Sequence, residues 1–256
     1  MRIVIKIGTS TITNQYGIIN EESIDSLCFV VSKLKEENNE VIMVSSGAIA
    51  MGVGKLSLEK KPKDIPTKQA CAAIGQLELM GIYDKHFQNF GQFAAQILLT
   101  EDDINNDIRR ENFKNTILRI IHLGAIPIIN ENDTVAIKEI CSIGDNDTLA
   151  AYVAANIDAD LLILLSDIDG LYTNDPKQNK DATLIKNIYE ITDDIYALCG
   201  DKGSELSTGG MITKINAAKI TCDAGTDLFI TNGKDPKIIF DIINGKEVGT
   251  RFIAKK

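Results

Sequence analysis

Near its first residue the chain has an apolar segment that one lysine interrupts: residues 3–10 are IVIKIGTS. In a β-strand, alternate side chains point to opposite faces, so Ile3, Ile5 and Ile7 share one face while Lys6 lies on the other. A lysine that is partly buried near the end of such a strand needs an anionic partner. The segment therefore predicts a strand that leads into an anion-binding turn. The alternative is an edge strand whose Lys6 reaches solvent.

A second segment has the same chemistry. Residues 207–214, STGGMITK, place two adjacent glycines before a predicted helix that carries Lys214 within its first turn or so. The glycines allow backbone N–H groups to face one concavity, and the helix N-terminus adds about half a positive charge. The segment predicts a phosphate-binding loop, although an ordinary glycine-containing helix start is also compatible with it. Neither loop follows the Walker pattern.

The overall composition excludes several classes of protein. The chain has 256 residues, 44% of them hydrophobic, which is enough for a substantial core. Its formal charge is −9 without a stripe of lysine and arginine, which argues against a nucleic-acid surface. No apolar run approaches about 18 residues, and the first strand begins too early to follow a signal peptide. We therefore expect no nucleic-acid partner, no membrane association and a cytoplasmic location.

Cysteine and histidine do not form a metal or nucleophile motif. The five cysteines are widely spaced without a Cys-x-x-Cys pair, and only two histidines are present. This pattern argues against a zinc site, and nothing in it supports Ser/His/Asp catalysis. Most of the cysteines have apolar neighbours in the sequence, so we expect reduced thiols in the core rather than redox chemistry.

Strand-like and helical segments alternate along the chain, which predicts parallel strands joined by crossover helices. Predicted strands cover residues 3–7, 41–45, 93–99, 126–129, 161–165 and 228–231, and predicted helices cover residues 21–38, 67–90, 110–123, 148–156 and 211–224. Residues 161–165 are apolar throughout and should form a central strand. Residues 177–202 are polar and irregular, which predicts an excursion from the sheet that could act as a mobile flap.

Small and polar side chains follow four of the predicted strands. They are GTS at 8–10, SSGA at 45–48, NEND at 130–133 and SD at 166–167. Ligands of open α/β sheets bind beyond the carboxyl ends of the strands. Each group alone would be an ordinary turn, but together with the two phosphate-type loops they predict a binding crevice. A further polar turn, GDND at 144–147, precedes the predicted helix from residue 148 and could cap it.

Six segments, in this order along the chain, resemble those of the amino acid kinase family. They are IKIGTS at 5–10, VSSGAIA at 44–50, INEND at 129–133, GDND at 144–147, DGLYT at 169–173 and TGGMITK at 208–214. The resemblance implies an α/β fold, a three-layer α/β/α sandwich with a mainly parallel central sheet. It also implies a single kinase domain over residues 1–256, with an amino-acid-binding lobe in about residues 1–150 and a nucleotide-binding lobe in about residues 151–256.

The resemblance implies transfer of phosphate from ATP, with Mg²⁺, to the side-chain carboxylate of L-glutamate, the first step towards proline. This chemistry suits a chain with few histidines, because a glutamate side chain with a pKa of about 4.3 is already ionised and needs no general base. Transfer then depends on positioning two anions and neutralising phosphoryl charge, which two lysines and Mg²⁺ can supply. Aspartate, acetylglutamate, carbamate or uridylate as acceptor, or a catalytically silent amino-acid sensor, are alternatives that the loops alone do not separate.

The resemblance also assigns roles to residues. It makes Lys6 and Lys214 catalytic, on opposite sides of the transferring phosphate, with Asp147 holding both lysines. It places the substrate glutamate against Ser46, Asp133 and Asn146, with Asp133 facing the α-ammonium group, unless Asp133 is only a turn carboxylate. It assigns the nucleotide to Lys6, Gly8, Thr9, Ser166, Asp167, Thr208, Gly209, Gly210, Met211, Ile212, Thr213 and Lys214, with backbone donors from Gly8, Thr9 and Gly210. It implies no side chain as a resident metal ligand.

Partners follow from the same resemblance. It implies a homo-oligomer, either a dimer or a tetramer, with feedback inhibition by proline and a functional link with glutamate-5-semialdehyde dehydrogenase. Many bacterial relatives carry a C-terminal PUA domain, which we expect this chain to lack. Ser166 stands where relatives usually have threonine, and it keeps the hydroxyl group.

Overall fold

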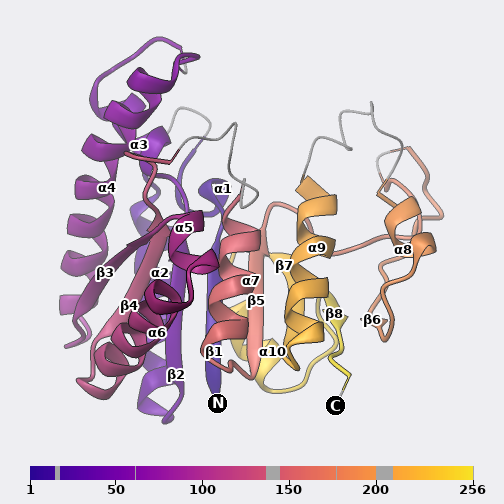
Figure 1. The fold of residues 1–256 in the computed structure, drawn as a ribbon. Helices are drawn as coiled ribbons and strands as arrows, with labels where there is room; N and C mark the ends of the chain where they lie inside the picture. The colour runs from indigo at the N-terminus through magenta and orange to yellow at the C-terminus, as the bar shows by residue number, and fades with distance from the viewer. Residues whose placement is uncertain (15–17, 61, 137–144, 177, 200–209, 256) are drawn as a thin grey trace.

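The computed structural model of the protein describes residues 1–14, 18–60, 62–136, 145–176, 178–199 and 210–255. Within these ranges the strands form one sheet in the order β3-β4-β2-β1-β5-β7-β8-β6 (Figure 1). The strands are β1 (Arg2–Ile7), β2 (Glu40–Ser45), β3 (Ala94–Leu99), β4 (Ile126–Glu131), β5 (Leu161–Ser166), β6 (Asn187–Ile188), β7 (Asp227–Asn232) and β8 (Thr250–Phe252). Neighbouring strands run parallel except β7 and β8, so the predicted mainly parallel sheet is confirmed.

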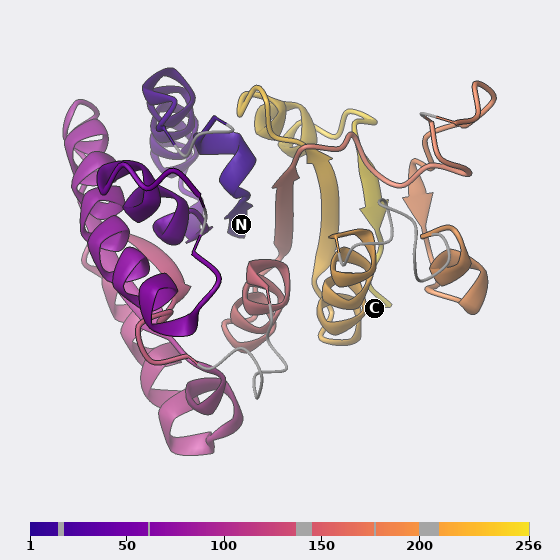
Figure 2. The same ribbon diagram turned by 90° about the horizontal axis from the view of Figure 1, so that it is seen from above.

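Helices cover both faces of this sheet and make three layers, as Figure 2 shows from above. On one face lie α2 (Glu21–Glu36), α4 (Ile65–Gln88) and α10 (Ile238–Ile243). On the other face lie α6 (Asp107–His122), α7 (Asn146–Asn156) and α9 (Gly210–Asp223). The shorter helices are α1 (Thr9–Ile12), α3 (Ala48–Lys55), α5 (Glu101–Asn105) and α8 (Asp193–Ala197). The predicted three-layer α/β/α sandwich is confirmed.

Strands β1 and β5 lie side by side in the middle of the sheet. All six residues of β5 are buried, which confirms the prediction of a central strand. In β1, Ile3, Ile5 and Ile7 pack into the core beneath α2, α4 and α10, while Val4 packs into the core on the opposite face. Lys6 is 8% exposed, so the edge-strand alternative is wrong.

Helix α7 begins at Asn146, two residues earlier than the sequence pattern predicts. Asp145 is its cap, because the Oδ1 atom of Asp145 accepts a hydrogen bond of 2.8 Å from the Thr148 N–H group. The first turn of α7 therefore carries Asn146 and Asp147, two of the residues that the sequence assigns to the site.

Helices α3 and α4 touch backbone to backbone. A Cβ atom on Gly75 would lie 1.9 Å from the Ala48 carbonyl oxygen, and one on Gly52 would lie 1.9 Å from the Cys71 carbonyl oxygen. Only glycine fits at these two positions without moving a helix. The close contact fixes the start of α3, where Gly47 has a φ of 108°, and with it the polar turn after β2.

Several elements were not predicted. The turn after β1 forms the short helix α1, and α3, α5, α10 and β8 fall in segments without a clear period. The expected excursion over residues 177–202 is wrong for part of its length, since this stretch contains α8 and returns to the sheet as β6, which pairs with β8. Residues 177 and 200–202 of the stretch lie outside the described residues.

Candidate active site

Loops at the carboxyl ends of the central strands are tied to one another through the backbone. The Gly8 N–H group donates to the Leu165 carbonyl at 3.2 Å, which joins the loop after β1 to β5. The Ser46 N–H group donates to the Ile7 carbonyl at 3.1 Å, which joins the loop after β2 to β1. These bonds gather the polar turns at one edge of the sheet, as the sequence predicts.

A buried ionic cluster lies at this edge. The Lys6 Nζ atom is 2.7 Å from the Asp147 Oδ1 atom, and the Lys214 Nζ atom is 2.9 Å from the Asp147 Oδ2 atom. Both lysines are 8% exposed and Asp147 is 3% exposed. The three residues come from β1, α7 and α9, so the fold brings together all three side chains that the sequence assigns to catalysis.

The cluster has an excess positive charge. Burial by itself would raise the pKa of the Asp147 carboxyl, but Lys6 and Lys214 outweigh this effect and hold that pKa below its usual value. Asp147 is therefore ionised at neutral pH, and the two lysines with one carboxylate carry a net charge of +1. Buried charge of this kind needs a further anion, which is the property of a phosphate site.

The start of α9 adds polar groups to the cluster. Lys214 Nζ also donates to the Gly210 carbonyl at 3.3 Å, and the Thr213 hydroxyl group donates to the same carbonyl at 3.0 Å. The N-terminus of this 14-residue helix thus lies beside both lysines. Of the predicted phosphate loop, Gly210 to Lys214 are in this helix, while Thr208 and Gly209 lie outside the described residues.

Asn146, which precedes Asp147, contacts Ser46, another of the predicted substrate residues. Its Nδ2 atom lies 2.8 Å from the Ser46 hydroxyl oxygen, 3.1 Å from the Ser45 carbonyl oxygen and 2.9 Å from the Asn130 Oδ1 atom. Ser46 and Asn146, predicted to share the acceptor site, are therefore in contact. Asp133 follows β4 in a turn and is partly exposed.

A second layer of buried polar residues supports this group and was not predicted. Asn130 Nδ2 donates to Gln76 Oε1 at 2.8 Å, and the Ser45 hydroxyl lies 3.0 Å from the Tyr83 hydroxyl. Gln76 and Tyr83 belong to α4. They were not predicted because a single polar residue in a helix, such as Gln76, is easily assigned to the exposed face. The sequence signal that could have found them is a seven-residue spacing, which places Gln76 and Tyr83 on one face of the helix.

The role of Gly8 as a backbone donor to a nucleotide stays a prediction. In this structure its N–H group faces the Leu165 carbonyl. A Cβ atom at this position would lie 3.1 Å from the Leu165 carbonyl oxygen, which is a tight contact. Thr9 is the first residue of α1, where helix N–H groups have no partner inside the helix.

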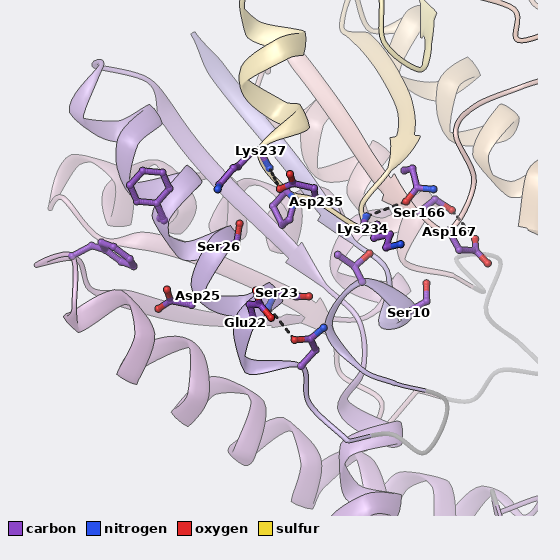
Figure 3. A pocket seen from close by; sticks show the side chains of 16 residues that line it. Ser10, Glu22, Ser23, Asp25, Ser26, Ser166, Asp167, Lys234, Asp235 and Lys237 are labelled. Atoms are coloured by element: carbon purple, nitrogen blue, oxygen red, sulfur yellow. Dashed lines mark hydrogen bonds between the residues drawn. The ribbon is translucent and has the colours of Figure 1, made fainter.

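A cavity of about 910 Å³ adjoins these loops on the face of the sheet that α2 and α10 cover (Figure 3). Ser10 in α1, Ser166 at the end of β5 and Asp167 after it form one wall, and the Ser166 hydroxyl donates to Asp167 at 3.1 Å. The other walls come from α2 and from the loop before α10. Ser166 and Asp167, two of the predicted nucleotide residues, line the cavity, whereas Lys6, Lys214 and Asp147 of the ionic cluster do not.

The described cysteines are free and mostly buried. Cys28, Cys71 and Cys199 are buried, which confirms the prediction of core thiols for these three. Cys222 is partly exposed, and Cys141 lies outside the described residues. Burial raises the pKa of Cys199 to about 11, so its thiolate is not populated at neutral pH. Within the described ranges no helix is both long and apolar enough to cross a membrane.

The chain belongs to the amino acid kinase family, whose family model matches residues 1–232. It is similar over its full length to proteins named glutamate 5-kinase. It is 48% identical to the one from Clostridium perfringens (strain 13 / Type A), of which the match covers 96%. It is 50% identical to the one from Listeria innocua, of which the match covers 94%, and 48% identical to the one from Caldanaerobacter subterraneus, of which it covers 68%.

Solved structures of more distant proteins share the fold. An isopentenyl phosphate kinase from T. acidophilum superposes with a TM-score of 0.67 at 21% identity, covering 98% of this chain and 100% of that one. A UMP kinase from Bacillus anthracis superposes with a TM-score of 0.66 at 15% identity, covering 100% of this chain and 96% of that one. These likenesses support the fold, and the acceptor has to be argued from the site and from the nearer relatives.

Proposed function

We propose that this protein transfers the γ-phosphoryl group of ATP to the side-chain carboxylate of L-glutamate. The observation that carries the proposal is the buried cluster of Lys6, Lys214 and Asp147, whose net positive charge lies where the central strands end. Identity of about one half to proteins named glutamate 5-kinase supports glutamate as the acceptor. The product would be L-glutamate 5-phosphate, the first intermediate towards proline.

In the proposed reaction, one oxygen of the glutamate side chain attacks the γ-phosphorus atom. The bond from that phosphorus to the β,γ-bridging oxygen breaks, and ADP leaves with the electron pair of this bond. No proton has to move, because the acceptor carboxylate is ionised at neutral pH. The protein therefore needs to position two anions and to stabilise the charge on the group in transfer.

Lys6 and Lys214 are proposed to stabilise that charge. Asp147 holds their ammonium groups through its two oxygens, at 2.7 and 2.9 Å, so that both lysines are oriented before the nucleotide binds. Groups that are fixed in this way in a dry site lose little energy to reorganisation during the reaction. Asp147 is thus a positioning residue, and the two lysines would touch the phosphate.

The proposed binding residues form two groups. Ser46, Asn146 and Asp133 would hold the glutamate, with Asp133 opposite its ammonium group. The nucleotide would lie against Gly8, Thr9, Ser166, Asp167 and the segment from Thr208 to Lys214. In the first group Asn146 donates to the Ser46 hydroxyl, and the second includes the N-terminus of α9, a favourable place for phosphate oxygens.

Mg²⁺ is expected to arrive with ATP. Within the described residues no three or more His, Cys, Asp and Glu side chains gather as a metal site, and Asp147 is already occupied by two lysines. The chain therefore fits an ion held mainly by phosphate oxygens and water, as is usual for Mg²⁺. When bound, the ion neutralises part of the phosphate charge.

A hydroxamate assay tests the function. Hydroxylamine traps an acyl phosphate, so ATP and Mg²⁺ are supplied with L-glutamate, L-aspartate or N-acetyl-L-glutamate in parallel, and ADP release is followed with uridylate. We expect signal with L-glutamate alone. Signal with another acceptor would keep the reaction class and change the substrate, and silence with all of them would favour a sensor without catalysis.

The remaining parts of the proposal rest on the resemblance. They are the cytoplasmic location, the dimer or tetramer, inhibition by proline, the link with glutamate-5-semialdehyde dehydrogenase, and the division into an amino-acid lobe and a nucleotide lobe. Sedimentation of the purified protein and titration of its activity with proline would test the oligomer and the inhibition.

A further inference from the structure

One buried amide group near the proposed acceptor site has an unused donor. Gln76, in the middle of α4, is 8% exposed, and its Nε2 atom is buried without a hydrogen-bond partner among the described residues. Buried side-chain nitrogens almost always donate to something, so this atom calls for an explanation. A group on a bound substrate is one explanation, because the hydrogen bonds of Gln76 lead to the proposed acceptor residues.

The orientation of the amide is fixed by its neighbours. Asn130 Oδ1 accepts from the Glu131 backbone N–H at 2.9 Å, and a backbone N–H group can only donate. Asn130 must therefore turn its Nδ2 atom to Gln76, where it donates to Oε1 at 2.8 Å. Gln76 has only its Nε2 atom left. Exchanging the amide nitrogen and oxygen of Gln76 would place two donors face to face, so the free atom is a donor.

The same hydrogen bonds give the place of this donor relative to the reaction. They lead from Gln76 through Asn130 to Asn146, and the next residue, Asp147, holds the two lysines. The carboxylate that reacts must lie at the lysines. Gln76 lies at the opposite end of this chain of contacts, so its free donor is available for a second carboxylate of the same substrate.

We infer that Gln76 is a further substrate-binding residue, whose Nε2 group donates a hydrogen bond to the α-carboxylate of the acceptor amino acid. The inference rests on the proposed function. This role explains why the polar residue Gln76 is buried in α4. It also assigns the two charged groups of the substrate, its α-carboxylate and its α-ammonium group, to different residues. A neutral donor at Gln76 suits a carboxylate, while the carboxylate of Asp133 suits an ammonium group.

The variants Q76E and Q76M separate binding from support. Q76E keeps an oxygen that can accept from Asn130 but replaces the donor by a second anion, whereas Q76M removes both. A hydrogen bond to a charged group is worth enough to change binding by about 10- to 100-fold. We therefore expect Q76E to raise the KM for L-glutamate by about 10- to 100-fold and to leave the KM for ATP within about twofold. Q88E, the same change on the exposed last residue of α4, is the matched control and should leave both unchanged.

The measurement is steady-state hydroxamate formation at varied L-glutamate and at varied ATP, with melting temperatures to verify the fold. A normal KM for L-glutamate in Q76E would overturn the inference. If the KM for L-glutamate were raised only in Q76M, Gln76 would serve only to support Asn130. Equal losses for both substrates with a lower melting temperature would also overturn it, because they indicate a structural role.

Two further comparisons make the result specific. The α-amide of L-glutamate keeps one accepting oxygen but replaces the other by an NH2 donor and removes the negative charge. The carboxylate introduced by Q76E would accept from this NH2 group and repel a carboxylate, so the preference for L-glutamate over the amide should fall in Q76E if the contact is to that carboxylate. An unchanged preference would overturn the assignment. The wild-type protein tests the proposed function on its own. If it used L-aspartate instead of L-glutamate, the proposed function would need revision, and Q76E would be measured with L-aspartate. Inactivity of the wild type with every acceptor would overturn the proposed function and the role of Gln76 together.

Discussion

The buried ionic cluster predicts that Asp147→Asn destabilises the protein more than loss of either lysine. The substitution keeps the size of the side chain but removes its charge. One oxygen remains to accept from one lysine, while the new amide nitrogen, a donor, faces the other. Lys6 and Lys214, each 8% exposed, would then be two buried cations without an anion.

The expected magnitude follows from the geometry. Removing one partner of a buried ion pair costs about 3–5 kcal/mol, because the other charge stays in a poorly solvated place. Asp147 serves two such pairs, at 2.7 and 2.9 Å, so the change falls in this range. For a chain of this length, 1 kcal/mol shifts the melting temperature by about 2–4 °C, so we expect a decrease of about 6–20 °C. Lys6→Met leaves a neutral pair of Lys214 and Asp147 and should cost less than half as much.

The assay is thermal unfolding of the purified proteins without and with added phosphate. An anion that binds only the folded state raises the melting temperature. The increase with phosphate should be largest in the protein whose cluster has the highest positive charge. The cluster charge is about +2 in Asp147→Asn, +1 in the wild type and 0 in Lys6→Met. Because its cluster is neutral, the Lys6→Met variant is the control for general effects of salt. A decrease of less than about 2 °C in Asp147→Asn, or an equal response of all three proteins to phosphate, would refute the reasoning.

Four further results are expected. Lys214→Ala should lower kcat by roughly 10²-fold or more in the hydroxamate assay, with a normal circular dichroism spectrum, because one fixed cation is lost at the phosphate; near-normal turnover would remove Lys214 from the mechanism. Asp133→Asn should raise the KM for L-glutamate far more than that for ATP, and equal changes would point to misfolding. The pKa of the Asp147 carboxyl is depressed in the folded protein, so its contribution to stability is present above the pKa of about 3.9 that it has in the unfolded chain. This contribution is lost as pH falls through the folded pKa. The free energy of unfolding should therefore fall more steeply with pH below about pH 4 in the wild type than in Asp147→Asn. Gly75→Ala should reduce the free energy of unfolding by about 1–3 kcal/mol in urea, because its methyl group would overlap the Ala48 carbonyl, whereas Gly81→Ala, with open space on the same helix, should not.

Local patterns were sufficient for much of the fold. The period-2 alternation of β1 predicts which face Lys6 occupies, and the apolar run of β5 predicts its central place. Short elements such as α1 and β8 have too few residues to show a period, so they were missed. The start of α7 was missed by two residues because Asp145, rather than a later residue, accepts from the Thr148 N–H group.

The support of the acceptor site was harder to predict. Ser46 and Asn146 were predicted from their segments, but the contacts of Asn146 with Asn130 and of Asn130 with Gln76 arise only in the tertiary structure. A buried glutamine in a helix differs from an exposed one by its contacts and not by its neighbours in sequence. The hydrogen bond from the Gly8 N–H group to the Leu165 carbonyl shows the same limit, since it exists only because β1 and β5 are adjacent in the sheet.

The ionic cluster itself follows from strand order and the handedness of crossovers. A right-handed connection between parallel strands places its helix on one face when the chain moves one way across the sheet and on the other face when it moves back. From β1 to β2 the chain moves towards β3, and α2 lies on the face of Ile3, Ile5 and Ile7. From β4 to β5 and from β5 to β7 it moves the opposite way, so α7 and α9 must lie on the other face, which is the face of Lys6. Because β4 and β5 flank β2 and β1, α7 has to cross directly over β1, and Asp147 in its first turn reaches Lys6 there while α9 brings Lys214 to the same carboxylate. The order of the strands, which the sequence patterns did not supply, therefore decides that α7 and α9 bring Asp147 and Lys214 to the face of β1 on which Lys6 lies.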